Sequence, residues 1–476
     1  MNEGLYVAGT AASELDLLAL SRRGPIHFMG VCGAGMSALA EYVVRAGGQA
    51  TGCDAKAASA PPGLERMGVS VAQGHAAAHV VNATAVIVTS AVPARHPELE
   101  SARDRGIAVL KRGSALGALV NHGRVVAVAG THGKTTTTGM IAMTLEAAAM
   151  DPTAFVGGRM PGWHGGLRVG GPLFVVEADE YDRSFLALRP DMAVVTSIEP
   201  DHMEIYGDLD TLYDAFVDFL EPVPEDGLIA VCTDDRGGAA LVERMPAGRV
   251  LTYGLEPGAR LRAERLHADV GVTRFHVIRD EAMVGEYRIR VPGRHNVQNA
   301  LATLAVALHA GADPDAVRMG LERFAGVERR FQQLGEPRGV MVIDDYAHHP
   351  TEIQATIAAA RERFPARRLV AVFQPHLYSR TRDLWQAFGR ALAAADVVWL
   401  TDVFPAREEP IEGVTGELVA NAARDAGAPV RYIAAVAELE RAIAGWLEPG
   451  DVCVLMGAGD IDEHAHGLVA RLEAES

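Results

Sequence analysis

The segment 125–138 constrains the fold more than any other part of the chain. The four apolar residues 125–128 lead through Gly130 and Gly133 to Lys134, which four threonines follow. This pattern predicts a buried strand that turns tightly into a helix, with the free N–H groups of the helix N-terminus facing whatever lies in front of the turn. Repetition of such units builds an α/β fold with parallel sheets.

The same turn suits a nucleoside triphosphate. Backbone amides would cradle the phosphates, Lys134 would reach the β- and γ-phosphate oxygens, and the Thr135 hydroxyl would ligate Mg²⁺. The glycine spacing is shorter than in the standard Walker A pattern, so an ordinary glycine-rich turn is the competing interpretation. Lys134 is one of only three lysines in an arginine-rich chain, which favours the phosphate site. We therefore expect ATP and Mg²⁺ as cofactors, with the ATP-binding residues Gly130, Thr131, His132, Gly133, Lys134, Thr135 and Thr136.

Composition excludes several functional classes. The net charge of −17 over 476 residues disfavours a general nucleic-acid binder. The four cysteines lie far apart and lack metal-site spacing, so we expect free thiols in a reducing cytosol. Residues 1–20 have no basic start, and no apolar run is long enough for a membrane span, so the sequence predicts a cytoplasmic protein without membrane insertion.

Strand-like runs alternate with helical patterns through most of the chain, and they fall into three units. The expected strands are 26–29, 49–52 and 85–88 in the first unit, 173–176 and 192–195 in the second, and 340–343, 369–373, 397–400 and 452–456 in the third. Residues 251–291 alternate in the manner of antiparallel strands. Boundaries at the Gly/Ala-rich passage 113–123 and near Val327 give the domains 1–120, 121–327 and 328–476.

A second glycine-rich turn, 30–37, follows the first expected strand. Its glycines and the helix N-terminus behind them predict a diphosphate site formed by Gly33, Ala34, Gly35, Met36 and Ser37. Asp54 follows the next strand, where an acid could bind a ribose. The spacing differs from the dinucleotide fingerprint, and the residues leave a nicotinamide cofactor and another diphosphate, such as a UDP-sugar, equally open.

Carboxylates and a histidine follow two strands of the second unit. Glu177 and His202 come after expected parallel strands, whose carboxyl ends share one edge, so both should converge with Thr135 on a Mg²⁺ site. For Glu180 and Asp182 a solvated acidic turn is the alternative, and for Asp182 it is preferred. Asn296 and Asn299 lie three residues apart at the start of an expected helix, so one face of that helix presents two amides that could bind an adenine edge. The alternative for Asn296, preferred without further context, is a helix N-cap.

Two strand-end loops of the third unit are dense in polar residues. They span 344–352 and 374–381, and Arg329 and Arg330 precede them. Because clustered polar groups at strand ends carry desolvation costs, these loops are interpreted as a second substrate platform rather than scaffold.

Together these segments closely resemble the Mur ligase family. The matching stretches are 30–37, 130–138, 177–185, 198–206, 292–300, 329–331, 344–353 and 374–381, in the order of the family and across essentially the whole chain. The resemblance implies three domains: a Rossmann-like N-terminal domain for the UDP-sugar, a central P-loop ATPase-type domain, and a Rossmann-like C-terminal domain for the amino acid. It also implies that the first glycine turn binds UDP-N-acetylmuramate.

The resemblance further implies ATP-dependent joining of L-alanine to the lactyl carboxylate of UDP-N-acetylmuramate through an acyl phosphate, in peptidoglycan precursor synthesis. The nearest alternative within the family is a recycling ligase that joins a tripeptide to the same sugar; a nucleotide-dependent switch and a dehydrogenase are more distant. The implied site residues are Lys134, His202 and Arg380 for catalysis, Asn296, Asn299, Arg330 and Asp345 for ATP, His75 and Ser90 for the UDP-sugar, and Tyr346, His348 and Arg380 for the amino acid.

Two departures from the family pattern bear on mechanism. No lysine follows Lys134, so a carbamylated lysine cannot hold a second Mg²⁺. Leu377 stands where many alanine-adding members have arginine, which leaves fewer positive groups around the alanine carboxylate. The sequence leaves the oligomeric state open between monomer and homodimer.

Overall fold

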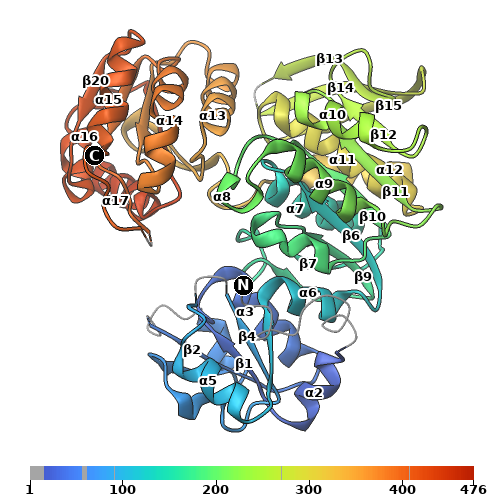
Figure 1. Ribbon diagram of the computed structural model, residues 1–476. Coiled ribbons are helices and arrows are strands. Elements are labelled where there is room, and N and C mark those ends of the chain that lie inside the picture. The colour runs from blue at the N-terminus through green and yellow to red at the C-terminus, as the bar shows by residue number, and fades with distance from the viewer. Residues whose placement is uncertain (1–14, 56–61, 90–91, 270, 407, 476) are drawn as a thin grey trace. The chain divides into compact units, whose positions relative to one another are not determined.

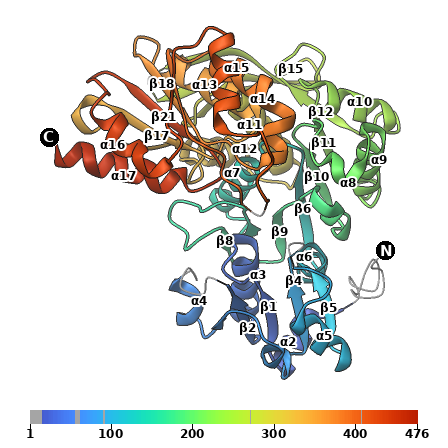
Figure 2. The same cartoon turned by 60° about the vertical axis from the view of Figure 1, so that its left-hand side comes forward.

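The computed structural model describes residues 15–55, 62–89, 92–269, 271–406 and 408–475 (Figures 1 and 2). The chain forms two compact units, one comprising Met1–Glu264, His276–Tyr287 and Gln298–Phe324, and the other Arg265–Phe275, Arg288–Val297 and Ala325–Ser476. Ser90, expected at the UDP-sugar site, lies outside the described residues. In the part of the chain that is described, no helix combines the length and apolarity needed to cross a bilayer.

The N-terminal region contains a five-stranded sheet in the order β3-β2-β1-β4-β5, and all its pairings are parallel. Its strands are β1 (Ile26–Met29), β2 (Ala50–Asp54), β3 (Ser70–Gln73), β4 (Ala85–Val88) and β5 (Ala108–Lys111). The sequence patterns did not predict β3 and β5. β3 is partly exposed and lacks a continuous apolar run, whereas β5 follows from the apolar run 107–110, which was not assigned to a strand. The strand order reverses between β1 and β4, the position at which open α/β sheets commonly bind ligands.

Helices cover both faces of this sheet: α2 (Leu17–Arg23), α3 (Ala34–Arg45), α4 (Pro62–Arg66), α5 (Pro97–Asp104), α6 (Arg112–Val120) and the 3₁₀ turn η2 (Ala77–Val80). The glycine-rich passage interpreted as a boundary forms α6. A Cβ on Gly117 would lie 2.3 Å from the Ala187 carbonyl oxygen, so α6 packs closely against η3 (Tyr181–Ala187). Its glycines therefore permit close packing and do not mark a loose connection.

The central sheet has ten strands in the order β15-β14-β13-β12-β11-β10-β6-β9-β7-β8. Their bounds are β6 (Arg124–Ala129), β7 (Thr153–Phe155), β8 (Leu167–Arg168), β9 (Leu173–Glu177), β10 (Met192–Val195), β11 (Leu228–Cys232), β12 (Leu251–Gly254), β13 (Leu261–Asp269), β14 (Val272–Arg279) and β15 (Ala282–Ile289). β11, β10, β6, β9 and β7 pair in parallel, and β8 runs antiparallel to β7 at the edge of the sheet. β12 is also parallel to both neighbours, so its expected antiparallel pairing is wrong: alternation reports which face is buried and not the direction of a neighbour.

Seven helices of the central region follow the strands: α7 (Lys134–Ala147), α8 (Met203–Tyr206), α9 (Leu209–Leu220), α10 (Arg236–Arg244), α11 (Arg294–His309), α12 (Pro314–Arg323) and the 3₁₀ helix η3 already given. Strand β6 is completely buried except at Arg124. The apolar run 125–128 therefore lies in a strand whose side chains are buried.

The C-terminal region has six strands in the order β16-β17-β21-β18-β19-β20. They are β16 (Gln332–Gly335), β17 (Met341–Asp345), β18 (Leu369–Phe373), β19 (Val397–Leu400), β20 (Val430–Tyr432) and β21 (Val452–Met456), with helices α13 (Pro350–Arg363), α14 (Tyr378–Leu392), α15 (Gly416–Asp425), α16 (Leu439–Ala444) and α17 (Ile461–Ala474). β16 runs antiparallel to β17, and the pairings among β17, β21, β18, β19 and β20 are parallel. Separate apolar clusters bury the two faces of the sheet. The expected α/β fold with largely parallel sheets is confirmed.

Candidate functional site

The loop between β6 and α7 has the geometry of a phosphate-binding turn. Gly133 caps α7 with a φ of 82°, and Gly130 has a φ of 126°. A Cβ on Gly130 would lie 2.3 Å from the Thr196 hydroxyl oxygen, so the loop requires glycine there. Because α7 begins at Lys134, the free N–H groups of its first turn are available to an anion.

The segment after β10 holds this loop in place. The Thr131 amide donates to the Ser197 carbonyl at 2.9 Å, and the His132 amide donates to the Ser197 hydroxyl at 3.1 Å. The Glu199 amide donates to the Thr131 hydroxyl at 2.9 Å. A Cβ on Gly133 would lie 3.1 Å from Asn299 Oδ1, so Asn299 lies directly beside the turn. Its expected contact with adenosine stays a prediction.

Lys134 is paired with a residue that the sequence analysis did not assign to the site. Its Nζ lies 2.9 Å from both carboxylate oxygens of Glu180 and also donates to the Gly130 carbonyl. Glu180 is only 4% exposed, so the alternative of a solvated acidic turn does not apply to it. Burial acts to lower the pKa of Lys134, but Glu180 and then Asp179 outweigh it and raise that pKa, which keeps the ammonium group charged.

Asp182, for which the solvated turn was preferred, also forms an ion pair. Lys111 Nζ lies 2.6 Å from its carboxylate, and the neighbouring Asp179 accepts from Arg112 at 2.9 Å. These pairs join the start of α6 to η3. Spacing in the sequence could not reveal them, because the partners are about seventy residues apart.

The proposed metal ligands lie on one edge of the central sheet. Glu177 ends β9 and is in register with Val128 of β6, and β6 in turn pairs with β10, after which His202 follows. Glu177 accepts the Gly157 amide at 2.6 Å. His202 caps α8 in a left-handed conformation with a φ of 56°, and its ring contacts that of Tyr181. The parallel pairing places the carboxyl ends of β9, β6 and β10 on one edge of the sheet, and the convergence of Thr135, Glu177 and His202 on a metal ion stays a prediction.

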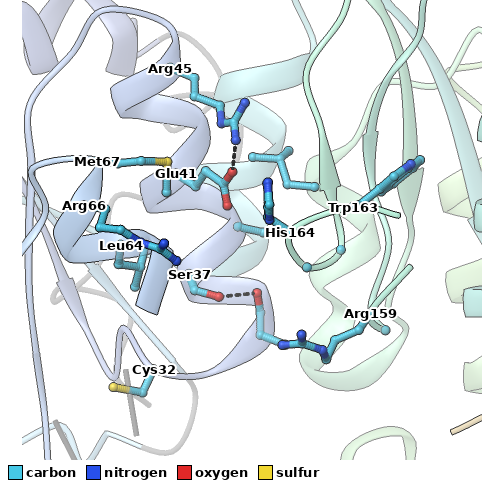
Figure 3. Close-up of a pocket in the computed structure, with 17 residues that line it drawn as sticks. Cys32, Ser37, Glu41, Arg45, Leu64, Arg66, Met67, Arg159, Trp163 and His164 are labelled. Carbon is cyan, nitrogen blue, oxygen red and sulfur yellow. Dashed lines mark hydrogen bonds and ion pairs between the residues drawn. The ribbon is translucent and has the colours of Figure 1, made fainter. Parts of the chain in front are cut away.

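A cavity of about 850 Å³ adjoins the first glycine turn (Figure 3). Cys32, Ser37 and Glu41 line one side, and Arg159, Trp163 and His164 line the other, from the loop between β7 and β8. The helix after the turn, α3, begins at Ala34, within the segment 30–37 that was expected to form the turn. The residues on the second side of the cavity were not predicted from the sequence, because the loop that carries them follows no strong strand pattern. The glycines around Arg159 were the signal that could have indicated this loop.

The remaining UDP-sugar residues have different surroundings. Asp54 accepts the Cys32 amide at 3.1 Å and so holds the glycine turn. His75 Nδ1 lies 3.1 Å from Cys53 Sγ and 3.6 Å from a Glu98 oxygen. Ligand contacts by Gly33, Ala34, Gly35, Met36, Ser37, Asp54 and His75 stay predictions.

In the second unit, the structure brings together the polar side chains that follow β17. The Arg330 guanidinium lies 4.9 Å from the centre of the Tyr346 ring, and the Tyr346 and His348 rings are 5.2 Å apart. Burial lowers the pKa of His348, and the positive charge of Arg380 adds to this effect while Glu352 opposes it. Tyr346 and His348 thus lie side by side, with Arg380 near enough to act on His348, and the role of these residues in binding an amino acid stays a prediction.

Two expected adenosine ligands also brace the backbone. Asp345 accepts the amides of Ala347 at 2.7 Å and Phe331 at 2.9 Å, and burial raises its pKa to about 6. Asn296 Nδ2 donates to the Pro292 carbonyl at 2.6 Å and so holds the start of α11. Their roles in nucleotide binding stay predictions.

Asp344, beside Asp345, is fully buried, and neither of its carboxylate oxygens accepts a hydrogen bond from the described residues. Burial raises its pKa to about 7 although Arg329 opposes the shift. Between about pH 4 and 7 the native protein therefore holds a proton that the unfolded chain lacks, and stability should fall as pH rises, by up to about 1.4 kcal/mol per pH unit. Asp344→Asn should flatten this slope and be more stable than the parent at pH 8.

Urea unfolding at several pH values, followed by tryptophan fluorescence, measures this slope. Three of the four tryptophans, Trp385, Trp399 and Trp446, report on the second unit. Asp344→Ala is the matched control, because it also removes the titratable carboxyl group but, unlike Asp344→Asn, leaves a cavity. An identical slope in Asp344→Asn and the parent would mean that Asp344 does not hold the proton.

Comparison with known proteins gives consistent matches along the chain. Family models match residues 25–124 (Mur ligase family, catalytic domain), 128–307 (Mur ligase middle domain) and 329–459 (Mur ligase, glutamate ligase domain). The UDP-N-acetylmuramate–L-alanine ligases of Myxococcus xanthus and Salinibacter ruber are 44% and 42% identical, over 92% and 96% of both chains.

Solved structures agree with these relatives. The UDP-N-acetylmuramate-alanine ligase of Thermotoga maritima superposes with a TM-score of 0.83 at 29% identity, covering 95% of this chain and 100% of its own. A murein peptide ligase of Psychrobacter arcticus gives a TM-score of 0.68 at 26% identity, covering 94% and 99%. The alanine ligase is thus the more similar of the two in structure.

Proposed function

The chain belongs to the Mur ligase family, and from this we propose that it joins L-alanine to the lactyl carboxylate of UDP-N-acetylmuramate at the expense of ATP. The observation that carries the proposal is identity of 42–44% over nearly the full length to relatives with that activity in their names. The recycling ligase that adds a tripeptide is less supported, since the solved murein peptide ligase superposes less closely.

The reaction requires activation of a carboxylate, which is a poor electrophile. A lactyl oxygen attacks the γ-phosphorus of ATP and ADP leaves. The alanine amine then attacks the acyl carbon, the C–O bond to phosphate breaks, and inorganic phosphate and an amide result. Both steps concentrate negative charge, so preorganised positive groups should supply most of the catalysis.

We assign this charge compensation first to Lys134. In the structure its ammonium group is engaged by Glu180, and an incoming phosphate would share or replace this partner. The first turn of α7, with Thr135 and Thr136, would contact the phosphates. Mg²⁺, when bound, would neutralise phosphate charge; the hydroxyl, carboxylate and imidazole of Thr135, Glu177 and His202 are suitable donors at one sheet edge.

The cavity beside the first glycine turn is our candidate for the UDP-sugar. Its volume of about 850 Å³ falls within the range of sites for ligands of this size. Arg159, Arg66 and Arg45 line it and provide positive charge in a chain whose net charge is strongly negative. For the amino acid we propose Tyr346, His348 and Arg380, with Arg380 binding the alanine carboxylate. We also propose that the reaction takes place in the cytoplasm.

A substrate panel tests the proposed function. Phosphate release from ATP is measured with UDP-N-acetylmuramate and L-alanine, L-serine, glycine or the murein tripeptide. We expect the highest kcat/KM for L-alanine, about tenfold or more above glycine, because one methyl group in a fitted pocket gives that discrimination. Preference for the tripeptide would identify a recycling ligase, and phosphate release independent of both co-substrates would indicate a nucleotide switch.

A further inference from the structure

Four residues with metal-binding side chains meet in the N-terminal region, away from the nucleotide turn. They are His27 on β1, Cys53 on β2, His79 on η2 and Glu98 on α5, and their ligand atoms all lie within 4.8 Å of one another. His27 Nε2 is 3.3 Å from Cys53 Sγ, which in turn is 3.3 Å from Glu98 Oε1. His27, Cys53 and Glu98 are fully buried.

These separations suit a small cation with mixed ligands. A tetrahedral Zn²⁺ with bonds of 2.0–2.3 Å places its ligand atoms about 3.3–3.7 Å apart. His79 Nδ1 and Glu98 Oε1 are closer, at 2.7 Å, because they share a hydrogen bond that an ion would replace. The second nitrogen of His27, Nδ1, lies 3.0 Å from the Thr51 hydroxyl, the type of outer hydrogen bond that orients metal-binding histidines.

The charge balance also favours a cation. Glu98 is buried, and within the described part of the chain its ion-pair partners are three histidines, His75, His79 and His96, rather than an arginine or lysine. A buried carboxylate needs a compensating charge, which a bound cation would supply directly.

We propose that His27, Cys53, His79 and Glu98 bind one Zn²⁺ ion. Nitrogen, sulfur and carboxylate oxygen are the ligands that Zn²⁺ takes in proteins, and four of them close a structural site. The ion would join β1, β2, η2 and α5. It would thereby hold the segment between β3 and η2, which carries His75, against the sheet.

The test uses the full chain, stripped of metal with a chelator and titrated with Co²⁺. We expect one equivalent to bind, with the visible absorption of tetrahedral cobalt and a thiolate-to-cobalt charge-transfer band, and Zn²⁺ should displace it. Millimolar Mg²⁺ should not compete, which separates this site from the nucleotide metal. Cys53→Ser should remove the charge-transfer band, and Glu98→Gln should weaken Co²⁺ binding at least tenfold.

Cys232→Ser is the matched control, because Cys232 is a buried free thiol outside the cluster, and it should keep the band. Far-UV circular dichroism checks that each variant is folded. If Cys53→Ser is unfolded, His79→Gln replaces it, since His79 is partly exposed, and weaker binding is again expected. Failure of the parent protein to bind Co²⁺ or Zn²⁺, or a charge-transfer band that persists in Cys53→Ser, would show that the cluster is only a hydrogen-bonded network.

Discussion

Lys134→Ala should lower kcat by about 10³-fold or more. The ammonium group of Lys134 stands at the start of α7, where the transferring phosphoryl group is expected, and loss of one preorganised charge in such a site costs about 3–4 kcal/mol or more. ADP formation in the presence of UDP-N-acetylmuramate and L-alanine measures the effect. Near-normal turnover would mean that ATP is not bound at this loop.

The same substitution should also destabilise the protein. Removal of Lys134 leaves the Glu180 carboxylate buried without its partner, and breaking a buried pair in this way costs about 3–5 kcal/mol. The double variant Lys134→Met, Glu180→Gln removes both charges at similar volume and is the matched control. Thermal unfolding should show recovery of most of the lost stability, while kcat remains low. Recovery of turnover together with stability would assign Lys134 a purely structural role.

The second large effect concerns the metal requirement. Replacing either Glu177 or His202 with alanine should raise the Mg²⁺ concentration for half-maximal activity about tenfold or more, because each would remove one ligand at the edge shared by β9, β6 and β10. Mg²⁺ titrations at saturating substrates measure this shift. Added bicarbonate should have no effect, because no lysine after Lys134 is available for carbamylation.

Glu204→Ala is the control for this titration. Glu204 lies beside His202, with 3.6 Å between its carboxylate and His202 Nδ1, but its side chain is 69% exposed. Its loss should leave the Mg²⁺ dependence close to that of the parent. If both Glu177→Ala and His202→Ala behave like Glu204→Ala, these residues do not hold the metal.

Many continuous apolar strands were predictable because burial on both faces leaves an uninterrupted run of valine, isoleucine and leucine, although the equally buried β11 was not predicted. This holds for β6, β10, β18 and β21, whose residues are almost all buried. Edge strands were not predicted, because their partial exposure allows polar residues that interrupt the apolar run. β3 and β20 are partly exposed and carry polar residues, so nothing in their composition separates them from loops.

The positions of residues at the ends of predicted strands could also be predicted from the sequence. In a parallel sheet, position along the chain specifies the edge at which a residue lies, and so Glu177 could be assigned to the edge that carries Lys134. The residues that face this edge from other segments could not be predicted in this way. Glu180 was not assigned to the site, because an acidic turn after a strand has no local feature that reveals a pairing with a lysine 46 positions earlier.

Local pattern therefore specifies the α/β class, the order of the strand–turn–helix units and the glycines that the phosphate loop requires, since these depend on interactions between near neighbours in the chain. Tertiary packing decides the rest. It joins Lys134 to Glu180, closes a cavity between α3 and the loop that carries Arg159, and brings His27, Cys53, His79 and Glu98 together from four elements. Each of these depends on segments distant in the sequence, and their contacts exist only once sheets and helices have packed.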